Sequence, residues 1–388
     1  MSITRLALIA GEPSGDVLGS TLLRGLQQQQ QAVGQHMDVQ GVGGPLMQAE
    51  GMHSWLDQSL FAVNGFTDVV TRLPYLLGHL RTLTNRVISY EPDMLVTIDS
   101  PALSFRVAKR MRQAGKHIPI VHIVAPTVWA WKPERAEKVA SFLDGLLTLF
   151  PFEPPYFQAH NLATTFVGHP LATRWENMDK TKARETLDWG AGETIMLVLP
   201  GSRSNEIQRL APVFGKTLAR VLSGNGVDRV VIPTLPHLET HIRQTIRDWP
   251  VNVDVITDTE TRFFSFAAAD VALAASGTVA MELAAAQVPV VVGYSMGRLS
   301  NWYIAPKLVT PYVSVINYMA DSMVQPEHIG RYCSADNLAP ALDRLLRDPA
   351  AARHQITKQN EQIQKLRAPG NDPEMAMAKA LMLYAPSS

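Results

Sequence analysis

The sequence contains very little cysteine: Cys333 is the one such residue among 388. A lone cysteine excludes an intrachain disulfide and a cysteine-based zinc site, and it fits a reducing cytosol. An excess of either charge is missing as well, because 35 Lys and Arg residues balance 35 Asp and Glu residues. This balance provides no overall field that would attract nucleic acid or an anionic bilayer. We therefore expect no nucleic-acid partner.

Long hydrophobic runs are also absent. A membrane-spanning helix needs about twenty consecutive apolar residues, and the longest apolar tract, residues 269–294, is interrupted by Asp270, Glu282 and Pro289. The apolar run Leu6–Ala10 is too short for a signal peptide and is typical of a first strand. With 46% hydrophobic and 18% charged residues, the composition is that of a soluble protein without a membrane span.

Strand-like and helix-like segments alternate along the whole chain, which predicts doubly wound parallel sheets. The length favours two domains, and a polar stretch over residues 171–182 is a plausible crossover. We predict an α/β fold of two facing Rossmann-like domains, residues 1–175 and 176–354, with a cleft between them and a helical tail from about residue 355 that packs on the first domain or on a partner subunit. The predicted strands are 6–10, one ending at 41–44, 94–98, 118–124, 146–149, 165–167, 194–199, 230–232, 253–256, 271–275 and 288–294.

The strand–helix–strand unit over residues 269–294 contains the turn Ser276-Gly277-Thr278. Glycine lets a backbone approach a ligand closely, and the first N–H groups of a helix have no internal partner, so such a turn binds phosphate. Glu282 lies about one helical turn beyond Thr278 and is placed to accept from ribose hydroxyls. The alternative is an ordinary capped helix start whose Glu282 lies on a solvated face.

A second strand-to-helix turn with an affinity for anions is Gly201-Ser202-Arg203. The planar guanidinium of Arg203 suits phosphate, and two such turns in one half of the chain indicate a diphosphate ligand such as a nucleotide sugar. The alternative for Arg203 is a surface ion pair with Glu206, which would stabilise little.

Carboxylates follow two of the predicted strands in the first half, where ligand sites of parallel sheets lie. Asp99 ends a buried strand ahead of Pro101, and Glu12 follows the first strand. Either carboxylate can act as a general base if it reaches a substrate proton, or it can be a capping or turn residue. His169 is a candidate hydrogen-bond donor to a phosphate group or to a buried carbonyl. No cluster of His, Asp and Glu residues has the spacing of metal ligands.

The segment from Phe66 to Tyr90 has the spacing of an amphipathic helix. Its leucines either pack in the core or face the acyl region of a membrane, with Arg72, Arg81 and Arg86 at the headgroups. The acceptor- or membrane-facing candidates are Leu73, Leu76, Leu77 and Leu80.

Several motifs, in order from about Leu6 to Glu327, resemble those of the lipid-A-disaccharide synthase family. The resemblance is carried by Gly11–Asp16, Gly44-Pro45 with residues 47–51, Ile98–Pro101, Val128-Trp129-Ala130-Trp131, Pro151–Glu153, Gly168–Pro170, Leu199–Arg203 with Glu206, and Ser276–Thr278 with Glu282. The Gly-Glu-x-Ser-Gly-Asp and Trp-Ala-Trp signatures are specific, whereas the Ser-Gly-Thr turn alone is not.

The resemblance implies an inverting glycosyltransferase of the GT-B type with no cofactor and no metal for UDP binding. It would join UDP-2,3-diacylglucosamine to 2,3-diacylglucosamine 1-phosphate (lipid X) on the inner face of a Gram-negative inner membrane, as a cytoplasmic, peripheral protein. Asp99 matches the family's proposed base, and Glu12, Arg203 and Asn317 match residues important for activity. The matching UDP-site residues are Gly201, Ser202, Arg203, Ser276, Gly277, Thr278 and Glu282. The family's C-terminal tail can exchange between the subunits of a homodimer.

The sequence departs from the family pattern after Pro101, where Ala102-Leu103-Ser104 replaces the usual Asp-Phe-Asn. This change puts the support of Asp99 or the hydrogen bonds to the acceptor in question. Two other functions fit parts of the pattern: a GT-B isomerase such as a UDP-N-acetylglucosamine 2-epimerase, and a nucleotide-sugar sensor without catalysis. The isomerase should not need acyl chains on its substrate, and the sensor would not need Asp99.

Overall fold

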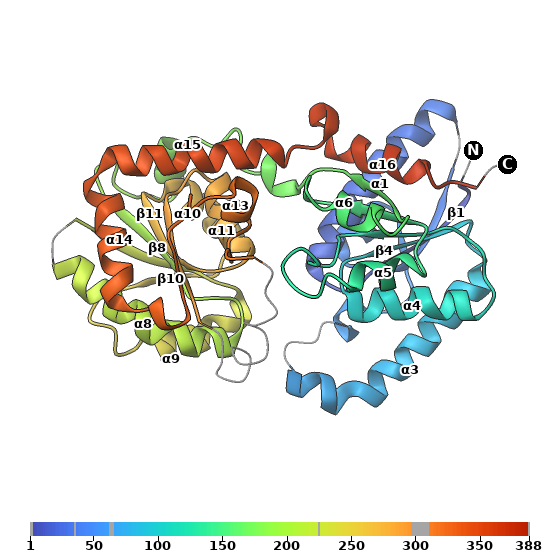
Figure 1. The fold of residues 1–388 in the computed structure, drawn as a ribbon, viewed down its shortest axis with the longest axis horizontal. Helices are drawn as coiled ribbons and strands as arrows, with labels where there is room; N and C mark the ends of the chain where they lie inside the picture. Colours follow the sequence, from blue (N-terminus) through green and yellow to red (C-terminus); the bar gives the residue numbers. More distant parts are fainter. Residues whose placement is uncertain (1–2, 35, 62–65, 224–225, 296–309, 387–388) are drawn as a thin grey trace. The chain divides into compact units, whose positions relative to one another are not determined.

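The computed structural model describes residues 3–34, 36–61, 66–223, 226–295 and 310–386, and it describes the backbone alone at 32–33 and 66–77. The chain forms two compact units (Figure 1). Unit 1 consists of Met1–Pro170 together with Leu366–Ser388, and unit 2 consists of Leu171–Lys365. Each unit contains its own parallel sheet with helices on both faces.

The sheet of unit 1 has seven parallel strands in the order β3-β2-β1-β4-β5-β6-β7. The chain moves outward from β1 in one direction and then restarts at β4 on the other side of β1, so the β1/β4 pair is the switch point at which doubly wound sheets bind ligands. The strands are β1 (Arg5–Ala10), β2 (Asp38–Val42), β3 (His53–Ser54), β4 (Met94–Ile98), β5 (Ile120–Ile123), β6 (Gly145–Thr148) and β7 (Ala163–Phe166).

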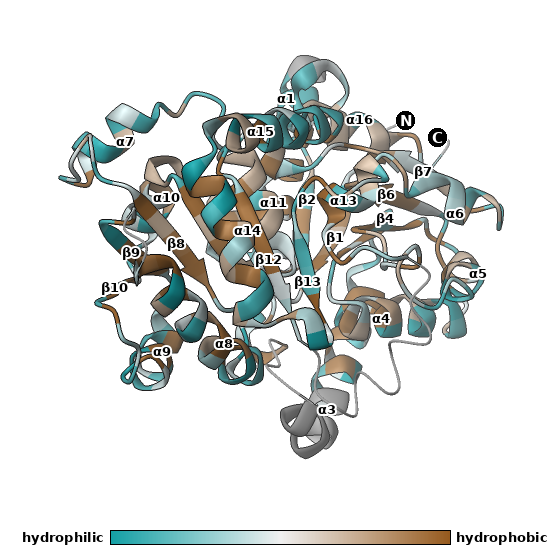
Figure 2. Ribbon diagram, turned by 60° about the vertical axis from the view of Figure 1, so that its left-hand side comes forward, coloured by the Kyte–Doolittle hydropathy of each residue, from teal (hydrophilic) through white to brown (hydrophobic). Residues whose placement is uncertain are grey.

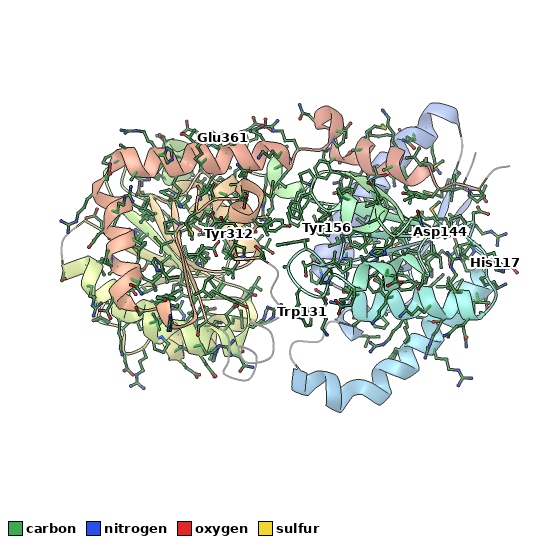
Figure 3. All side chains as sticks on the ribbon, in the orientation of Figure 1. His117, Trp131, Asp144, Tyr156, Tyr312 and Glu361 are labelled. Carbon is green, nitrogen blue, oxygen red and sulfur yellow. The ribbon has the colours of Figure 1, made fainter. Side chains whose placement is uncertain are left out.

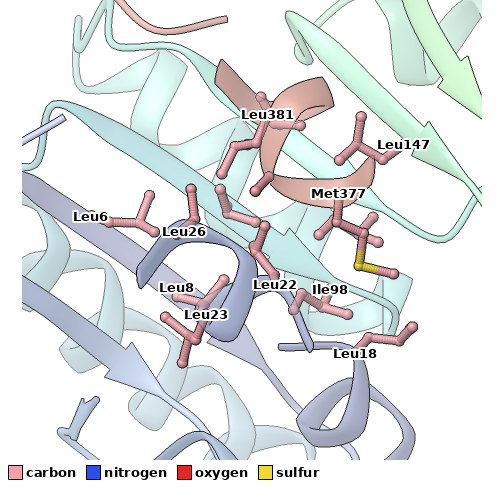
Figure 4. Packing of buried hydrophobic residues seen from close by; sticks show 14 of the residues in the cluster. Leu6, Leu8, Leu18, Leu22, Leu23, Leu26, Ile98, Leu147, Met377 and Leu381 are labelled. Atoms are coloured by element: carbon pink, nitrogen blue, oxygen red, sulfur yellow. The ribbon is translucent and has the colours of Figure 1, made fainter. Parts of the chain in front are cut away.

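Both faces of this sheet are buried because successive side chains of a strand point to opposite faces. Leu6 and Leu8 of β1 pack on one face with α1 and α16, as Figure 4 shows, whereas Ala7 and Ile9 pack on the other with α3, α4 and α5. This explains why the strands are continuous apolar runs. The helices are α1 (Pro13–Val33), α2 (Pro45–Ala49), α3 (Phe66–Tyr90), α4 (Pro101–Gln113), α5 (Arg135–Ala140), α6 (Pro154–Gln158) and α16 (Pro373–Met382), with short 3-10 turns at Gln58–Leu60, Pro170–Ala172 and Pro369–Asn371.

Unit 2 repeats this plan with six parallel strands in the order β10-β9-β8-β11-β12-β13, and its switch point is the β8/β11 pair. Figure 2 shows strands such as β8 and β12 as hydrophobic. The strands are β8 (Ile195–Leu199), β9 (Arg229–Pro233), β10 (Asp254–Ile256), β11 (Val271–Ala275), β12 (Val290–Tyr294) and β13 (Glu327–Ile329).

The helices of unit 2 are amphipathic where they cover the sheet. In α8, Ile207, Leu210, Phe214 and Leu218 recur at three- and four-residue intervals and are completely buried, which is the pattern of a helix with one apolar face. The helices are α7 (Lys180–Thr186), α8 (Ser204–Ser223), α9 (Glu239–Thr245), α10 (Thr259–Ala268), α11 (Thr278–Ala285), α13 (Val315–Ala320), α14 (Ala335–Arg347) and α15 (Pro349–Lys365), with 3-10 turns at Pro236–Leu238 and Gly330–Tyr332.

The C-terminal region divides between the units at Leu366. Helix α15 belongs to unit 2, although Figure 2 shows it as mainly hydrophilic, and it buries Gln355, Gln359 and Gln362. The predicted tail from about residue 355 is thus divided, because its part up to Lys365 belongs to unit 2 and only the part from Leu366 onward belongs to unit 1. Helix α16 lies along α1 in unit 1 (Figure 1), where Arg24 Nε is 2.5 Å from Glu374 Oε1.

The sequence predicted most of these elements. The strands Met94–Ile98 and Val271–Ala275 and the helix Phe66–Tyr90 are confirmed to the residue. The prediction missed β3 and β13, which are two and three residues long. Strands so short show no readable alternation, and the neighbouring strands of the sheet determine them.

Candidate functional site

The switch point of unit 1 brings together the two carboxylates that the sequence singled out. Glu12 follows β1 and Asp99 follows β4, and these strands are hydrogen-bonded neighbours. The Asp99 N–H donates to the carbonyl of Ile123 at 2.9 Å, which fixes the end of β4 against β5. Asp99 is half-buried and Glu12 is exposed, so both carboxylates are open to a ligand.

The backbone at Asp99 is strained. Asp99 and Ser100 have φ values of +49° and +43°, a left-handed conformation that costs non-glycine residues free energy and is concentrated at functional sites. Local hydrogen bonds hold it in place: the Ser100 N–H donates to Asp99 Oδ1 at 2.8 Å, and the Ser14 hydroxyl lies 3.3 Å from Asp99 Oδ2. The carboxylate is thus oriented before any substrate binds.

Ser104 provides the support for Asp99 that the changed sequence had put in question. Its side chain is fully buried, and its hydroxyl donates to the carbonyl oxygen of Asp99 at 2.6 Å. A serine at this position therefore anchors the loop after β4 without an amide side chain.

Asp16, the last residue of the first signature, has a structural role. It is 3% exposed, and its carboxylate accepts from the backbone N–H groups of Gly44, Leu46 and Met47 at 2.9 to 3.0 Å. Asp16 therefore caps the start of α2 from α1, which connects two motifs that are far apart in the sequence.

Three further motifs form one aromatic cluster in unit 1. The rings of Trp129 and Phe152 meet edge to face with centroids 5.3 Å apart, and Phe150 stacks on Phe152 at 5.4 Å and lies 5.4 Å from His169. Burial raises the pKa of the Glu153 carboxyl to about 8, against hydrogen bonds from Phe150 and Trp129 that lower it. Desolvation lowers the pKa of His169 to about 4, so both residues are uncharged near neutral pH.

Unit 2 contains a cavity of about 400 Å³ at its own switch point. The ends of β8, β9 and β11 surround it, so it lies at the edge of the sheet where a doubly wound fold binds its ligand. Its lining residues are Leu199, Pro200, Gly201, Ser202, Arg203, Glu206, Pro233, Thr234, Leu235, Leu238, Ile242, Arg262, Phe266, Ala275, Ser276, Gly277, Thr278, Val279 and Glu282. All seven predicted UDP-site residues are among them.

The start of α11 has the features that the phosphate interpretation needs. Gly277 is the N-cap with φ +139°, no side chain among the described residues caps the helix start, and a Cβ on Gly277 would have no heavy atom within 4 Å. Uncapped amides facing open space attract an anion. The hydroxyl of Ser276 is engaged elsewhere, because it donates to the carbonyl of Val313 at 2.9 Å.

The turn after β8 does not contain the Arg203–Glu206 ion pair that was the alternative interpretation of Arg203. Glu206 Oε2 accepts from the backbone N–H of Ser202 at 3.2 Å. Among the described residues Arg203 forms no ion pair with Glu206, and Arg203 is exposed beside the cavity. Its guanidinium is therefore available to a ligand.

Glu282 lies between two arginines. Arg174 Nη1 is 3.0 Å from Glu282 Oε1. Burial raises the pKa of Glu282, while the charges of Arg174 and Arg262 oppose this rise. The sequence analysis missed Arg262, which lines the cavity from α10 and has a pKa lowered by burial. Its neighbours in the sequence form no motif, and only the fold brings it to Glu282.

Asn317 lies inside unit 2. Its side chain is completely buried, donates to the carbonyl of Gln325 at 2.7 Å and to the carboxylate of Glu327, and accepts from the Gln325 N–H at 2.7 Å. Asn317 therefore holds the start of β13 against α13, and its importance for activity stays a prediction. Glu327 in turn accepts from the N–H groups of Val313 and Ser314, next to the carbonyl that Ser276 contacts.

The leucine residues of α3 were predicted to face the acceptor or the membrane, and the structure describes the side chain of one of the four candidates. Leu80 is 4% exposed and packs with Leu83 and Val87 in the core, so the acceptor- or membrane-facing expectation is wrong for Leu80. Leu73, Leu76 and Leu77 lie outside the residues whose side chains are described. In the described part of the chain, no helix combines the length and hydropathy that crossing a membrane requires.

No three His, Cys, Asp or Glu residues are grouped as metal ligands in the described ranges.

Comparison with known proteins gives a consistent result. The family model described as "Lipid-A-disaccharide synthetase" matches residues 6–381. A lipid-A-disaccharide synthase of Rhodospirillum centenum is 41% identical over 376 residues, covering 97% of this chain and 93% of that protein. Another, from Ruegeria pomeroyi, is 38% identical over 392 residues, covering 98% and 95%.

Solved structures share the fold at much lower identity. The UDP-GlcNAc 2-epimerase from Neisseria meningitidis, bound to UDP-GlcNAc, superimposes with a TM-score of 0.63 at 12% identity over 98% of both chains. MurG of Acinetobacter baumannii superimposes with a TM-score of 0.54 at 12% identity, covering 97% of this chain and 99% of that one. The predicted α/β fold of the GT-B type is confirmed.

Proposed function

The chain belongs to the lipid-A-disaccharide synthase family, and on that premise we propose that it joins UDP-2,3-diacylglucosamine to 2,3-diacylglucosamine 1-phosphate (lipid X) and releases UDP. Membership of this family identifies the protein as a glycosyltransferase of lipid A biosynthesis. We also propose which residues bind each substrate, with the donor in unit 2 and the catalytic base in unit 1.

The donor binds in the cavity of unit 2. The uncapped start of α11 takes the diphosphate, with Arg203 as a charged partner. Glu282 accepts from the ribose hydroxyls, and the apolar side chains of Leu235, Leu238 and Phe266 provide a surface for the base. The observation that carries this proposal is that one cavity is lined both by the uncapped amides at Gly277 and by the carboxylate of Glu282.

Asp99 is the general base. It removes the proton from the 6-hydroxyl of the acceptor, whose oxygen then attacks the anomeric carbon of the donor. The bond from that carbon to the β-phosphate oxygen breaks with its electron pair, so that UDP leaves and the configuration inverts. Arg203 and the helix start stabilise the charge that develops on the diphosphate.

We also propose that the protein works as a peripheral enzyme on the inner face of the inner membrane, because both substrates are acylated. Leu73, Leu76 and Leu77 remain the membrane-facing candidates. Replacing all three with Ser weakens binding to phospholipid vesicles on this account, whereas unchanged sedimentation with vesicles contradicts it. Exchange of the tail after Leu366 between two subunits would produce a homodimer, which cross-linking of α16 to α1 followed by mass analysis tests.

Product analysis tests the proposed function. The full chain, incubated with both acylated sugars in neutral detergent, yields a disaccharide 1-phosphate and one equivalent of UDP, measured by mass spectrometry. Deacylated sugars serve as the control and react much more slowly. Equal turnover of deacylated sugars, or epimerisation of UDP-N-acetylglucosamine added alone, contradicts the proposal.

A further inference from the structure

Two cations lie against one aromatic ring where the loop that follows β5 enters α5. Lys132 Nζ lies 4.4 Å from the centroid of the Trp131 ring, and the guanidinium carbon of Arg135 lies 5.8 Å from the same centroid. Figure 3 labels Trp131 among the side chains of unit 1. Neither cation forms an ion pair with a carboxylate among the described residues, although Glu134 and Glu137 lie on the same segment.

Trp131 adds an unused donor to this cluster. Its indole N–H is shielded from solvent and has no hydrogen-bond partner within the described part of the chain. An indole nitrogen donates and never accepts, and a shielded donor without a partner costs free energy. In the described part of the chain, Lys132 and Arg135 thus keep their charges without a carboxylate partner, beside an indole N–H that also lacks an acceptor.

The backbone of this loop is also strained where the cations project. Lys132 has φ +56°, the left-handed conformation that non-glycine residues adopt at a cost and that functional sites retain. The turn is fixed by the N–H groups of Ala130 and Trp131, which both lie 3.2 Å from the carbonyl oxygen of Thr127.

The loop begins beside the candidate base. It leaves β5 directly after Ile123, whose carbonyl accepts the N–H of Asp99, and β5 pairs with β4. Residues that follow neighbouring parallel strands share one edge of the sheet. A ligand that presents its hydroxyl to Asp99 therefore has this loop on the β5 side.

We propose that Lys132 and Arg135, which the Trp131 ring positions, bind the phosphate group of the acceptor. The proposal rests on the proposed function, in which the acceptor sugar bears a phosphate at carbon 1 and reacts at its 6-hydroxyl. These two groups are attached on either side of the ring oxygen, at carbon 1 and at the carbon 6 that carbon 5 bears, so the phosphate needs a cationic site near the base but distinct from it. The same chemistry also fits a phospholipid headgroup, and the experiment separates the two sources.

The experiment measures steady-state kinetics in neutral detergent, without a bilayer. Lys132→Gln and Arg135→Gln each raise the KM for the phosphorylated acceptor roughly tenfold or more, because each removes a charge-assisted contact. The KM for the UDP-sugar and kcat stay within about twofold, and Lys132→Arg retains most of the affinity. The matched control is Lys138→Gln, an exposed lysine on α5, which changes neither constant.

A second acceptor, which lacks the phosphate, tests whether the effect of Lys132 depends on that group. Wild-type protein has a raised KM for 2,3-diacylglucosamine without its phosphate, and Lys132→Gln causes no further rise with this acceptor. An equal rise with both acceptors, or no rise with either, overturns the assignment. If the Lys132 and Arg135 variants no longer sediment with vesicles but keep the wild-type KM for the acceptor, the assignment is also overturned, and these residues bind a lipid headgroup.

A binding measurement without turnover distinguishes loss of the phosphate contact from misfolding and from failure of the proposed function. In the Asp99→Asn background, Lys132→Gln weakens binding of the phosphorylated acceptor, measured by calorimetry, while UDP binding and thermal unfolding stay unchanged. If wild-type protein makes no disaccharide, the proposed function fails. If it makes disaccharide and the Lys132 and Arg135 variants bind the acceptor normally, only this assignment fails.

Discussion

Ser100 joins the two strands that flank the switch point of unit 1: its hydroxyl donates to Glu12, with Oγ 3.0 Å from Oε1. The backbone N–H of the same residue donates to the carboxylate of Asp99. One serine thus holds both candidate carboxylates, and its left-handed backbone directs the two hydrogen bonds to different residues. The positions of Glu12 and Asp99 are therefore coupled.

Replacing Ser100 with Ala tests this coupling. We expect kcat to fall roughly three- to tenfold, because the loss of one hydrogen bond costs about 1 kcal/mol and frees Glu12, while UDP affinity remains unchanged. Steady-state kinetics measure both values. Ser141→Ala, whose hydroxyl donates within an exposed turn, is the control, and a Ser100→Ala enzyme with full kcat would show that the bridge has no catalytic consequence.

Glu282→Gln tests the ribose contact in unit 2. The amide is a weaker acceptor than the carboxylate, so the Kd for UDP rises about tenfold. The Kd for 2′,3′-dideoxy-UDP, which lacks the ribose hydroxyls, stays within about twofold of the wild-type value. Titration calorimetry measures the four constants, and an equal loss for both nucleotides would assign Glu282 to the structure of the cavity through Arg174.

Glu153 makes stability depend on pH. Its pKa is raised from 4.5 to about 8 by burial, so the folded state keeps a proton that the unfolded state loses above pH 4.5. Stability consequently falls as pH rises through this range. Glu153→Gln removes this dependence, so the variant becomes more stable relative to wild type as the pH rises from 5 to 8.

Denaturant unfolding at several pH values measures the effect. A wild-type curve parallel to that of Glu153→Gln over this range would mean that Glu153 is ionised in the folded protein.

Gly25 allows α1 and α16 to approach each other closely. A Cβ at this position would lie 2.1 Å from the carbonyl oxygen of Glu374, so Gly25→Ala displaces α16 and destabilises its docking by about 1–3 kcal/mol. Limited proteolysis then removes the tail faster than in wild-type protein. Gly78→Ala is the matched control, because a Cβ there would contact nothing within 4 Å.

The sequence predicted the parts of the molecule in which local pattern and tertiary structure agree. Buried parallel strands are continuous apolar runs, so β4 and β11 were found with their bounds. Asp99 and Glu12 were recognisable because a polar residue directly after such a strand lies at the edge that binds ligands.

The remainder depends on contacts between distant residues. Arg262 belongs to the cavity only because α10 packs near Glu282, and no local signal announces it. The burial of Asn317 depends on its contacts with Gln325 and Glu327 at the start of β13, a strand that sequence patterns do not reveal. Glutamine is usually exposed, so no sequence pattern indicates that Gln359 of α15 is completely buried in unit 2.

The most direct test of the account is the single-turnover rate of Asp99→Asn with both acylated substrates saturating, measured alongside its Kd for UDP. We expect the rate to fall by roughly 10²- to 10⁴-fold, because a general base contributes an effect of this size, while the Kd for UDP stays at the wild-type value since the proposed UDP site lies in unit 2. A variant that retains a near-normal rate with intact UDP binding would contradict the assignment of Asp99 as the base.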